Sequence, residues 1–428
     1  MNSWSATESF LPNKSRIQLR RLPLLCLASF VLSAGCQSAP VTTGLDDAVR
    51  LQQVLRHQKV GIVTNHTAYN TAGRHIVDVV AELEDVQLVA LFGPEHGIRG
   101  AEEAGATVAS EQDPAKKVPI YSLYGATRKP TAKMLQNIDV LVFDIQDIGA
   151  RFYTYIYTMA LAMEAAAEQG IKFVVLDRPN PITGIHVEGN VLDPEFVTFV
   201  GLYPLPVRHG MTVGELATLI NNEGWLKKSV HADLTVIPLQ HWSRHEWFDQ
   251  TGLPFRQPSP NMPDLATATV YPGLCLIEGT NVSEGRGTDQ PFQLFGAPWV
   301  DAKKLCPRLN ELELPGVHFD PASFTPASIP QVANHPKYQG RTCFGARVRV
   351  IDRNIFQPYW TGIQIVNVLH TLYPDSLTWR TTSFDRLCGT DGIRKAIIAG
   401  QNLGALRRNW QPDLAQFEKT RRKYLLYP

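Results

Sequence analysis

The chain has 428 residues, of which 41 are Lys or Arg and 40 are Asp or Glu, so its formal charge is +1 at pH 7. This balance excludes the strong basic excess typical of nucleic-acid-binding proteins. The length exceeds what one hydrophobic core usually serves, so we expect two domains.

The N-terminal residues predict an export signal. A basic stretch precedes an apolar stretch at 22–32, which is too short for a typical membrane-spanning helix. Leu32-Ser-Ala-Gly-Cys36 then resembles the lipobox of bacterial lipoproteins. We therefore expect a lipoprotein signal peptide at 1–35, acylation of Cys36 and a linker at 36–48.

The residues after Cys36 predict where the mature protein is sorted. Gln37 and Ser38 stand where an Asp would retain a Gram-negative lipoprotein at the inner membrane, so we expect a periplasmic protein anchored in outer-membrane lipid. Cleavage removes four basic residues and one acidic residue, which lowers the formal charge from +1 to −2. Disulfides and buried free thiols are both compatible with the spacing of the later cysteines, which are Cys275, Cys306, Cys343 and Cys388.

Residues 49–265 alternate between strand-like and helix-like segments, which predicts an α/β domain with a Rossmann-like parallel sheet. The strand-like segments are 60–64, 86–92, 139–144, 173–177 and 234–238, and the helix-like segments are 73–82, 153–169 and 212–223. Pro and Gly become frequent near 259–263, and residues 266–428 predict a smaller α+β domain. Thr64-Asn-His-Thr67 replaces the glycine-rich fingerprint after the first strand, which argues against dinucleotide binding.

Polar clusters follow four of the predicted strands. They are Thr64–His66, Glu95–His96, Asp144–Arg151 and Asp177–Asn180. The carboxyl ends of parallel strands align, so we expect these clusters to form one site. Local structural roles are alternatives, since Asp144 could cap a helix and Asp147 could pair with Arg151 along one.

Glu95 is the candidate general acid. It lies in the loop after a buried strand, where Phe92 and Ile98 would desolvate its carboxyl and favour the protonated form. A structural salt bridge with Arg99 is the alternative. His66 and His96 with Asp144 could instead bind a metal ion, although no recognised ligand spacing supports this.

Other candidates flank predicted helices. Arg151 and Tyr153 begin an aromatic helix suited to sugar stacking and carboxylate binding, and Glu164 on this helix is either structural or directed into a cleft. Arg208 and His209 precede a helix start, which favours anions.

A glycine-rich loop at 278–288 carries Glu284 and Arg286. It either closes over the site or forms a surface connection.

Several blocks in order resemble the exo-β-N-acetylmuramidase family (NamZ-like, glycoside hydrolase family 171). They are Thr64–Thr67, Phe92–Gly97, Asp144–Tyr155, Leu176–Pro181, His209–Leu216, Pro258–Pro263, Glu278–Asn281 and Gly285–Thr288. The resemblance implies a Rossmann-like domain and a smaller domain with the cleft at their interface. It also implies metal-independent release of N-acetylmuramic acid from the non-reducing ends of peptidoglycan fragments, during cell-wall turnover and recycling, with no cofactor.

The resemblance and the residues together assign roles. Glu95 would be the acid, and the second carboxylate is open among Asp144, Glu164, Glu188 and Glu284, with Asp144 favoured because a strand end holds it rigidly. Alternatively, the substrate acetamido group acts as nucleophile. Arg151 or Arg208 would bind the lactyl carboxylate of the sugar. The remaining expected substrate contacts are Asn65, His66, His96, Arg99, Tyr153, His209, Asn261, Glu284 and Arg286.

Two other functions remain open at this point. A non-catalytic peptidoglycan-binding lipoprotein would need no general acid. A metal-dependent hydrolase would use His66, His96 and Asp144.

Overall fold

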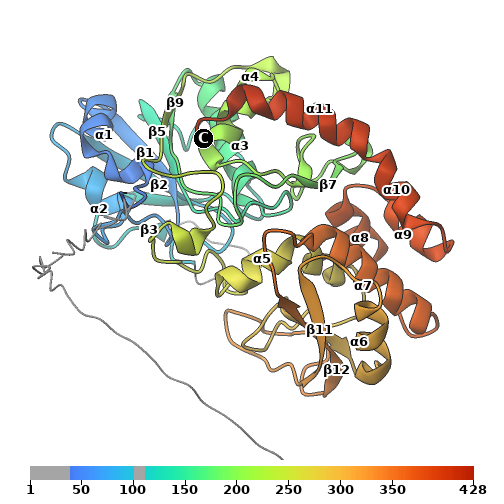
Figure 1. Ribbon diagram of the computed structural model, residues 1–428. Helices are drawn as coiled ribbons and strands as arrows, with labels where there is room; N and C mark the ends of the chain where they lie inside the picture. Colours follow the sequence, from blue (N-terminus) through green and yellow to red (C-terminus); the bar gives the residue numbers. More distant parts are fainter. Residues whose placement is uncertain (1–38, 101–110) are drawn as a thin grey trace, which may run out of the picture. The chain divides into compact units, whose positions relative to one another are not determined.

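A β-sheet organises the N-terminal part of the chain (Figure 1). The computed structural model describes residues 39–100 and 111–428, so the predicted signal peptide and Cys36 lie outside the described residues. The strands are β1 (Lys59–Thr64), β2 (Gln87–Gly93), β3 (Glu111–Gln112), β4 (Pro119–Ser122), β5 (Val140–Asp144), β6 (Lys172–Leu176) and β9 (Leu234–Ile237). Their order is β3-β4-β2-β1-β5-β6-β9, and β3 alone among these described strands runs antiparallel to its neighbour.

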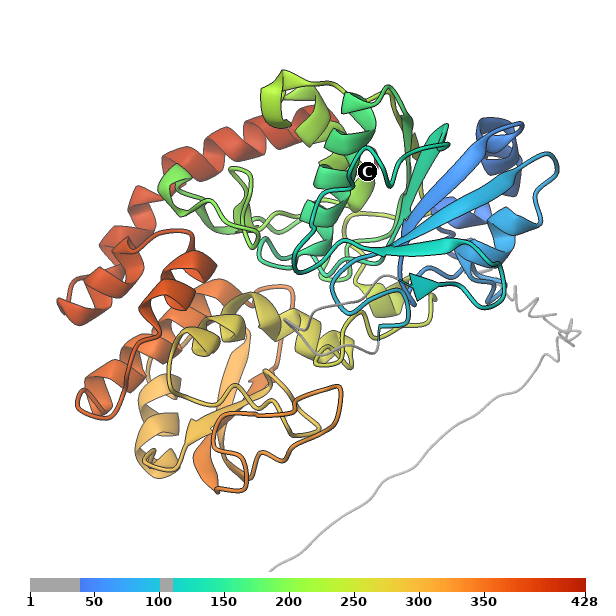
Figure 2. The ribbon, with the colours of Figure 1, turned by 180° about the vertical axis from the view of Figure 1, so that it is seen from behind.

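Helices cover both faces of this sheet (Figures 1 and 2). They include α1 (Ala48–Leu55), α2 (Ile76–Ala81), α3 (Tyr155–Glu168) and α4 (Val213–Asn222). Successive side chains of a strand point to opposite faces. In β5, Val140 and Val142 pack with α1 and α2, whereas Leu141 and Phe143 pack with α3 and α4. Burial on both faces explains the continuous apolar strands and confirms the predicted Rossmann-like fold.

The strand order reverses at β1, which pairs with β2 on one side and with β5 on the other. In open α/β sheets, ligands bind beyond the carboxyl ends of the strands at this point. The loops that follow Thr64, Gly93 and Asp144 begin at this edge. The fold therefore places three of the four predicted polar clusters around the switch point.

The C-terminal part combines an antiparallel sheet with helices, which confirms the predicted α+β architecture. Its strands are β10 (Leu294–Ala297), β11 (Val317–Phe324) and β12 (Cys343–Val350), in the order β10-β12-β11. Its helices are α5 (Leu265–Leu274), α6 (Ala302–Asn310), α7 (Pro358–Leu372), α8 (Thr381–Cys388), α9 (Gly392–Ile398), α10 (Leu403–Asn409) and α11 (Gln411–Arg421). A separate pair, β7 (Glu188–Val191) and β8 (Pro206–Arg208), lies earlier in the chain.

Both ends of the described chain pack on the N-terminal sheet. Val41 and Leu45 are buried, so part of the predicted linker at 36–48 is folded. The Tyr427 hydroxyl donates to the Asp177 carboxylate at 2.5 Å, and the Pro428 carbonyl accepts from the Arg244 amide at 2.9 Å. The last residues thus return to the part of the protein where the chain began.

The structure also bears on membrane-spanning helices and on the state of the cysteines. No helix in the described ranges is long and apolar enough to cross a membrane. Burial raises the pKa of each cysteine thiol that follows residue 111, and all of them are free: Cys275, Cys306, Cys343 and Cys388. Of the two alternatives that the sequence left open, buried free thiols are the observed one.

Candidate functional site

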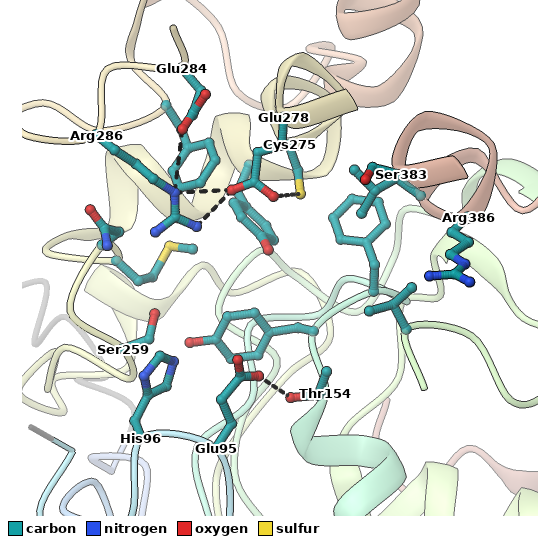
Figure 3. Close-up of a pocket in the computed structure, with 18 of the residues that line it drawn as sticks. Glu95, His96, Thr154, Ser259, Cys275, Glu278, Glu284, Arg286, Ser383 and Arg386 are labelled. Carbon is teal, nitrogen blue, oxygen red and sulfur yellow. Dashed lines mark hydrogen bonds and ion pairs between the residues drawn. The ribbon is translucent and has the colours of Figure 1, made fainter. Parts of the chain in front are cut away.

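A pocket of about 780 Å³ lies beyond the carboxyl end of β2 and is lined by residues from both parts of the chain (Figure 3). The N-terminal part contributes the Glu95 loop and residues 152–155. The C-terminal part contributes residues of α5, of the 278–286 loop, of the 333–337 loop and of α8. The pocket thus matches the predicted cleft between the two parts.

Glu95 lies at one side of this pocket and is half-buried. Its Oε2 accepts a hydrogen bond from the Thr154 hydroxyl at 2.8 Å, and its carboxylate also binds the Tyr124 hydroxyl. Burial and the charge of Glu95 raise the pKa of Tyr124, so this phenol stays protonated and donates. Two hydroxyl groups therefore orient the Glu95 carboxyl toward the cavity.

The loop that carries Glu95 has unusual backbone geometry. His96, Gly97 and Gly100 have φ values of 70°, 72° and 68°, in the left-handed region. A Cβ at Gly100 would lie 1.9 Å from Nδ1 of His66, so only glycine fits beside this ring. A non-glycine residue held at positive φ is a form of strain that is enriched at functional sites.

Aromatic rings form one wall of the pocket. Tyr153 and Tyr271 meet edge to face with ring centroids 5.9 Å apart, and Phe152 packs on Tyr271 at 5.5 Å. The Tyr153 side chain is 8% exposed, and its buried hydroxyl oxygen lies outside hydrogen-bonding geometry with other side chains. A buried hydroxyl without a protein partner can form a hydrogen bond to a polar group of a ligand.

An ionic cluster forms the opposite wall (Figure 3). Arg286 binds Oε1 of Glu278 through Nε at 3.0 Å and Nη2 at 2.6 Å, and its Nε lies 3.5 Å from Glu284. Lys337 lies 2.9 Å from Glu284 and also donates to the Val282 carbonyl at 2.8 Å. Two cations and two carboxylates thus neutralise each other across the pocket from Glu95.

This cluster fixes the ionisation of Glu284. Burial alone would raise the pKa of its carboxyl, but the charges of Lys337 and Arg286 outweigh burial and hold the pKa below its ordinary value. Glu284 therefore stays ionised and does not supply a proton at neutral pH.

Sequence and structure comparisons identify the family. The family models for the N-terminal and C-terminal regions of the exo-beta-N-acetylmuramidase NamZ match residues 60–266 and 269–427. The chain is 50% identical over 389 residues to the peptidoglycan beta-N-acetylmuramidase NamZ of Bacillus subtilis, which covers 90% of this chain and 91% of that protein. The chain belongs to the NamZ family.

Two crystal structures of DUF1343 family proteins from Bacteroides fragilis share the NamZ-family fold seen here. One superposes with a TM-score of 0.83 at 37% identity and the other with 0.74 at 33% identity. Each alignment covers 91% of this chain and 99% of the chain in the crystal structure. The match therefore extends over nearly the whole described chain.

The pocket of this NamZ-family chain gathers some of the residues predicted from sequence. Those that line it are Glu95, His96, Tyr153, Asn261, Glu284 and Arg286. The predicted residues that do not line it are Asn65, His66, Arg99, Asp144, Glu164, Arg151, Arg208 and His209. Each of these residues lies outside the pocket for its own physical reason.

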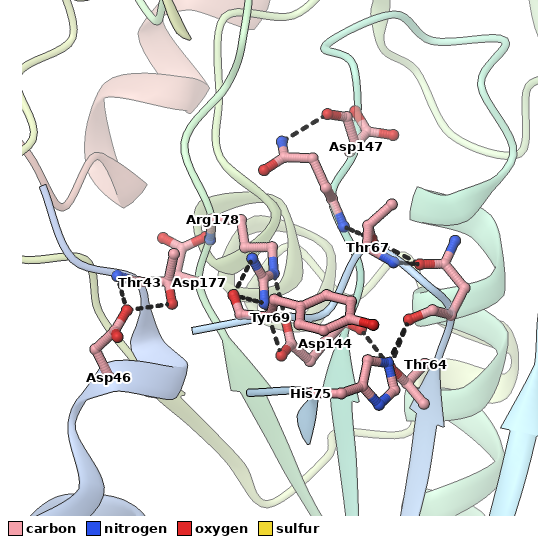
Figure 4. Close-up of polar contacts among 12 residues, drawn as sticks. Thr43, Asp46, Thr64, Thr67, Tyr69, His75, Asp144, Asp147, Asp177 and Arg178 are labelled. Atoms are coloured by element: carbon pink, nitrogen blue, oxygen red, sulfur yellow. Dashed lines mark hydrogen bonds and ion pairs between the residues drawn. The ribbon is translucent and has the colours of Figure 1, made fainter. Parts of the chain in front are cut away.

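Asp144 lies at the end of β5, as predicted, but it is fully buried (Figure 4). Arg178 binds both of its carboxylate oxygens, with Nη2 to Oδ2 at 2.9 Å, and also donates to the Tyr69 carbonyl. Asp144 therefore forms a structural ion pair that joins adjacent strand ends. This placement gives no support to Asp144 as the second carboxylate.

Arg151 is buried completely, and its guanidinium binds main-chain oxygens rather than the pocket. Nη1 donates to the carbonyls of Asn190 at 2.9 Å and Leu205 at 3.0 Å. Nη2 donates to those of Leu387 at 3.1 Å and Cys388 at 2.7 Å. Arg151 thus joins the N-terminal part to the end of α8. It does not line the pocket, and this placement gives no support to its predicted binding of a substrate carboxylate.

Arg208 and His209 are also buried away from the pocket. Arg208 donates to the Ile182 carbonyl and lies over the ring of Trp247 at 5.6 Å. Burial, together with the nearby Arg421 and Arg208, lowers the pKa of His209 to about 3, so this imidazole is neutral. These contacts give no support to the predicted anion-binding role.

The other predicted carboxylates are engaged elsewhere. Glu164 is 1% exposed, pairs with Lys129 at 2.6 Å and accepts from the Lys227 amide at 2.7 Å. Glu188 accepts from the Trp360 amide at 2.9 Å. Neither residue lines the pocket, and these contacts are structural.

Two predicted polar residues hold the strand-end loop together. Asn65 accepts from the Thr67 amide at 3.0 Å and from its hydroxyl at 2.6 Å. His66 contacts the Gln257 carbonyl at 2.7 Å and lines a separate hollow. Arg99 is exposed outside the pocket, which leaves its predicted pairing with Glu95 unsupported.

Several pocket residues escaped prediction from the sequence as individual contacts. They are Tyr124, Arg128, Thr154, Glu278, Lys337, Arg380 and Arg386. Thr154 and Glu278 belong to sequence blocks that carry the family resemblance, and this is the signal that could have found them. The others come from loops and helix ends whose direction depends on tertiary packing.

The side-chain geometry bears on the metal-binding alternative. Within residues 39–100 and 111–428, no group of three or more His, Cys, Asp or Glu side chains is arranged to hold a metal ion. Asp144, one of the three proposed ligands, is occupied by Arg178.

Proposed function

We propose that this chain is an exo-acting glycoside hydrolase that releases N-acetylmuramic acid from the non-reducing ends of peptidoglycan fragments. The observation that carries this proposal is the 50% identity to the peptidoglycan beta-N-acetylmuramidase of Bacillus subtilis over most of both chains. The presence of Glu95 in a sugar-sized pocket supports it, because glycoside hydrolysis needs a carboxylic acid beside the glycosidic oxygen.

Glu95 is the acid of this proposal. It donates its proton to the oxygen that leaves C1, and the electron pair of the breaking C1–O bond goes to that oxygen. Thr154 and Tyr124 hold the carboxyl and accept no proton themselves. Water completes hydrolysis by adding hydroxide to C1, and the remaining water proton restores the acid.

Glu278 replaces Asp144 as our candidate for the second carboxylate. Arg286 binds its Oε1 twice, which fixes the side chain, while the Cys275 thiol donates to Oε2 at 3.7 Å. A thiol is a weak donor, so Oε2 retains capacity to interact with substrate. Glu278 would either stabilise the positive charge that develops at C1 or orient an acetamido group that attacks C1.

The test uses the purified chain from residue 37 onward and a muramyl-glucosamine disaccharide with N-acetylmuramic acid at the non-reducing end. The proposal predicts equimolar release of N-acetylmuramic acid and N-acetylglucosamine, unchanged after exhaustive chelation. Binding of the disaccharide without release would favour the non-catalytic lipoprotein instead. Loss of turnover on chelation would favour the metal-dependent hydrolase.

We also propose that Cys36 carries a lipid anchor that holds the enzyme at the periplasmic face of the outer membrane. The support is the sequence pattern at 32–38 alone. An anchor there would keep the enzyme beside the cell wall whose fragments it degrades.

A further inference from the structure

The charges around the pocket are unequal. Its lining includes three carboxylates and five Arg or Lys side chains. Arg286 and Lys337 are paired with Glu278 and Glu284. The other three cations have no carboxylate within ion-pair distance among the residues that the structure describes; they are Arg128, Arg380 and Arg386. With respect to the described residues, the pocket thus offers guanidinium groups without an ion-pair partner, in a chain whose overall charge is close to zero.

Arg128 differs from the other two because its position is restrained. Its guanidinium lies over the ring of Phe199 with Cζ 4.4 Å from the centroid, a cation–π contact that leaves the edge N–H groups exposed. A stacked guanidinium has lost part of its conformational freedom before a ligand arrives, so binding costs less entropy.

Arg128 also lies on the same side of the pocket as Glu95. Tyr124 lies four residues before Arg128 in the loop after β4 and is hydrogen-bonded to Glu95. Burial and Glu95 raise the pKa of this tyrosine, whereas the positive charge of Arg128 opposes them. A group bound by Arg128 would therefore belong to a sugar that shares the glycosidic oxygen beside Glu95.

We infer that Arg128 is the specificity residue that binds the carboxylate of an acidic sugar in this pocket, with Arg380 and Arg386 adding attraction at the mouth. The inference rests on the proposed function, in which the released sugar carries a lactyl carboxylate. A guanidinium binds a carboxylate through two parallel charge-assisted hydrogen bonds. Arg151 and Arg208 were predicted to bind this carboxylate, but they are buried against main-chain carbonyls, so we assign the binding to Arg128.

The experiment compares two chromogenic N-acetylmuramides, one with a free lactyl carboxylate and one with the same group as its neutral methyl ester. For the wild type we expect kcat/KM to be about tenfold or more higher for the acid, as befits hydrogen bonds between charged groups. In Arg128→Gln the ratio falls to about one, through a higher KM for the acid. The value for the ester stays within about threefold, and Arg128→Lys restores part of the ratio.

Two controls make the assignment specific. Arg308→Gln removes an exposed arginine of α6 that pairs with Glu311 outside the pocket, and it should leave both substrates unaffected. Arg380→Gln and Arg386→Gln should keep most of the ratio but weaken its dependence on salt concentration. Arg128 is exposed, so thermal unfolding of Arg128→Gln should match the wild type.

The outcomes separate this inference from the proposed function. Failure of the wild type to cleave either muramide would overturn the proposed function and the inference together. Cleavage with a ratio near one, or a ratio that Arg128→Gln preserves, would overturn the inference alone. Loss of the ratio in Arg386→Gln but not in Arg128→Gln would also overturn it.

Discussion

Replacement of Arg151 by Met should strongly destabilise the fold. The wild-type guanidinium satisfies four buried carbonyls, and Met fills similar space without any donor. The Leu205 carbonyl also accepts from the Leu192 amide and the Cys388 carbonyl from the Asn190 side chain, so Met leaves two carbonyls without the donor that Arg151 supplied. A buried unpaired acceptor costs roughly 1–3 kcal/mol, so two cost about 2–6 kcal/mol. Removing a buried charge recovers part of its desolvation cost, which also lowers the pKa of Arg151 in the wild type. We therefore expect a net loss of about 2–4 kcal/mol.

Urea unfolding followed by tryptophan fluorescence measures this loss. Arg308→Met is the matched control, because its exposed pair with Glu311 should contribute less than about 1 kcal/mol. Part of the Arg151 effect should appear as loosened contact between the N-terminal part and α8, detected as faster amide exchange at Leu387 and Cys388. A stability within about 1 kcal/mol of the wild type would refute the reasoning that Arg151 joins the two parts.

Three other predictions concern protonation, catalysis and anchoring. Burial raises the pKa of Asp147 to about 7 from an ordinary 3.8. Between these pH values the folded state retains a proton that the unfolded state has lost. The free energy of unfolding therefore falls as pH rises, by up to about 1.4 kcal/mol per pH unit. Burial also raises the pKa of Asp177 to about 7, so Asp147→Asn, which can still accept from the Gly149 amide, should reduce rather than abolish the slope in unfolding measured at pH 5, 6 and 7. An unchanged slope would contradict the assignment. Glu278→Gln should lower kcat on the muramyl disaccharide by about 100-fold or more with folding intact, whereas a change below threefold would exclude Glu278 as the second carboxylate. Cys36→Ser should move the protein from the membrane fraction to the soluble fraction and abolish the acyl mass at the N-terminus, and retention in the membrane would disprove the anchor.

The sequence predicted the central sheet well because burial on both faces leaves a local signal. The predicted strand at 86–92 is observed as β2 (Gln87–Gly93), and that at 139–144 is observed as β5 (Val140–Asp144). Both faces of these strands are covered, so their residues are continuously apolar and the strands can be recognised without knowledge of tertiary contacts. The position of Glu95 follows from the end of β2 and was predictable for the same reason.

The partners of polar side chains were harder to predict. Arg151 lies beside pocket residues in sequence, yet its side chain turns inward toward carbonyls that are 39 to 237 residues away. Glu278 shows the opposite error, because it was not predicted as a site residue but lines the cavity, where Arg286 binds it. No local pattern records which way a side chain points once a strand has ended, so several residues predicted for the site are structural.

The central claim is that Glu95 supplies the proton for release of N-acetylmuramic acid. The most direct measurement is the single-turnover rate of release from the muramyl disaccharide by Glu95→Gln, beside Glu82→Gln, an exposed glutamate paired with Arg74. We predict a rate for Glu95→Gln that is at least about 100-fold below the wild type, with binding of the disaccharide preserved and Glu82→Gln unaffected. A rate for Glu95→Gln equal to that of the wild type would contradict the account.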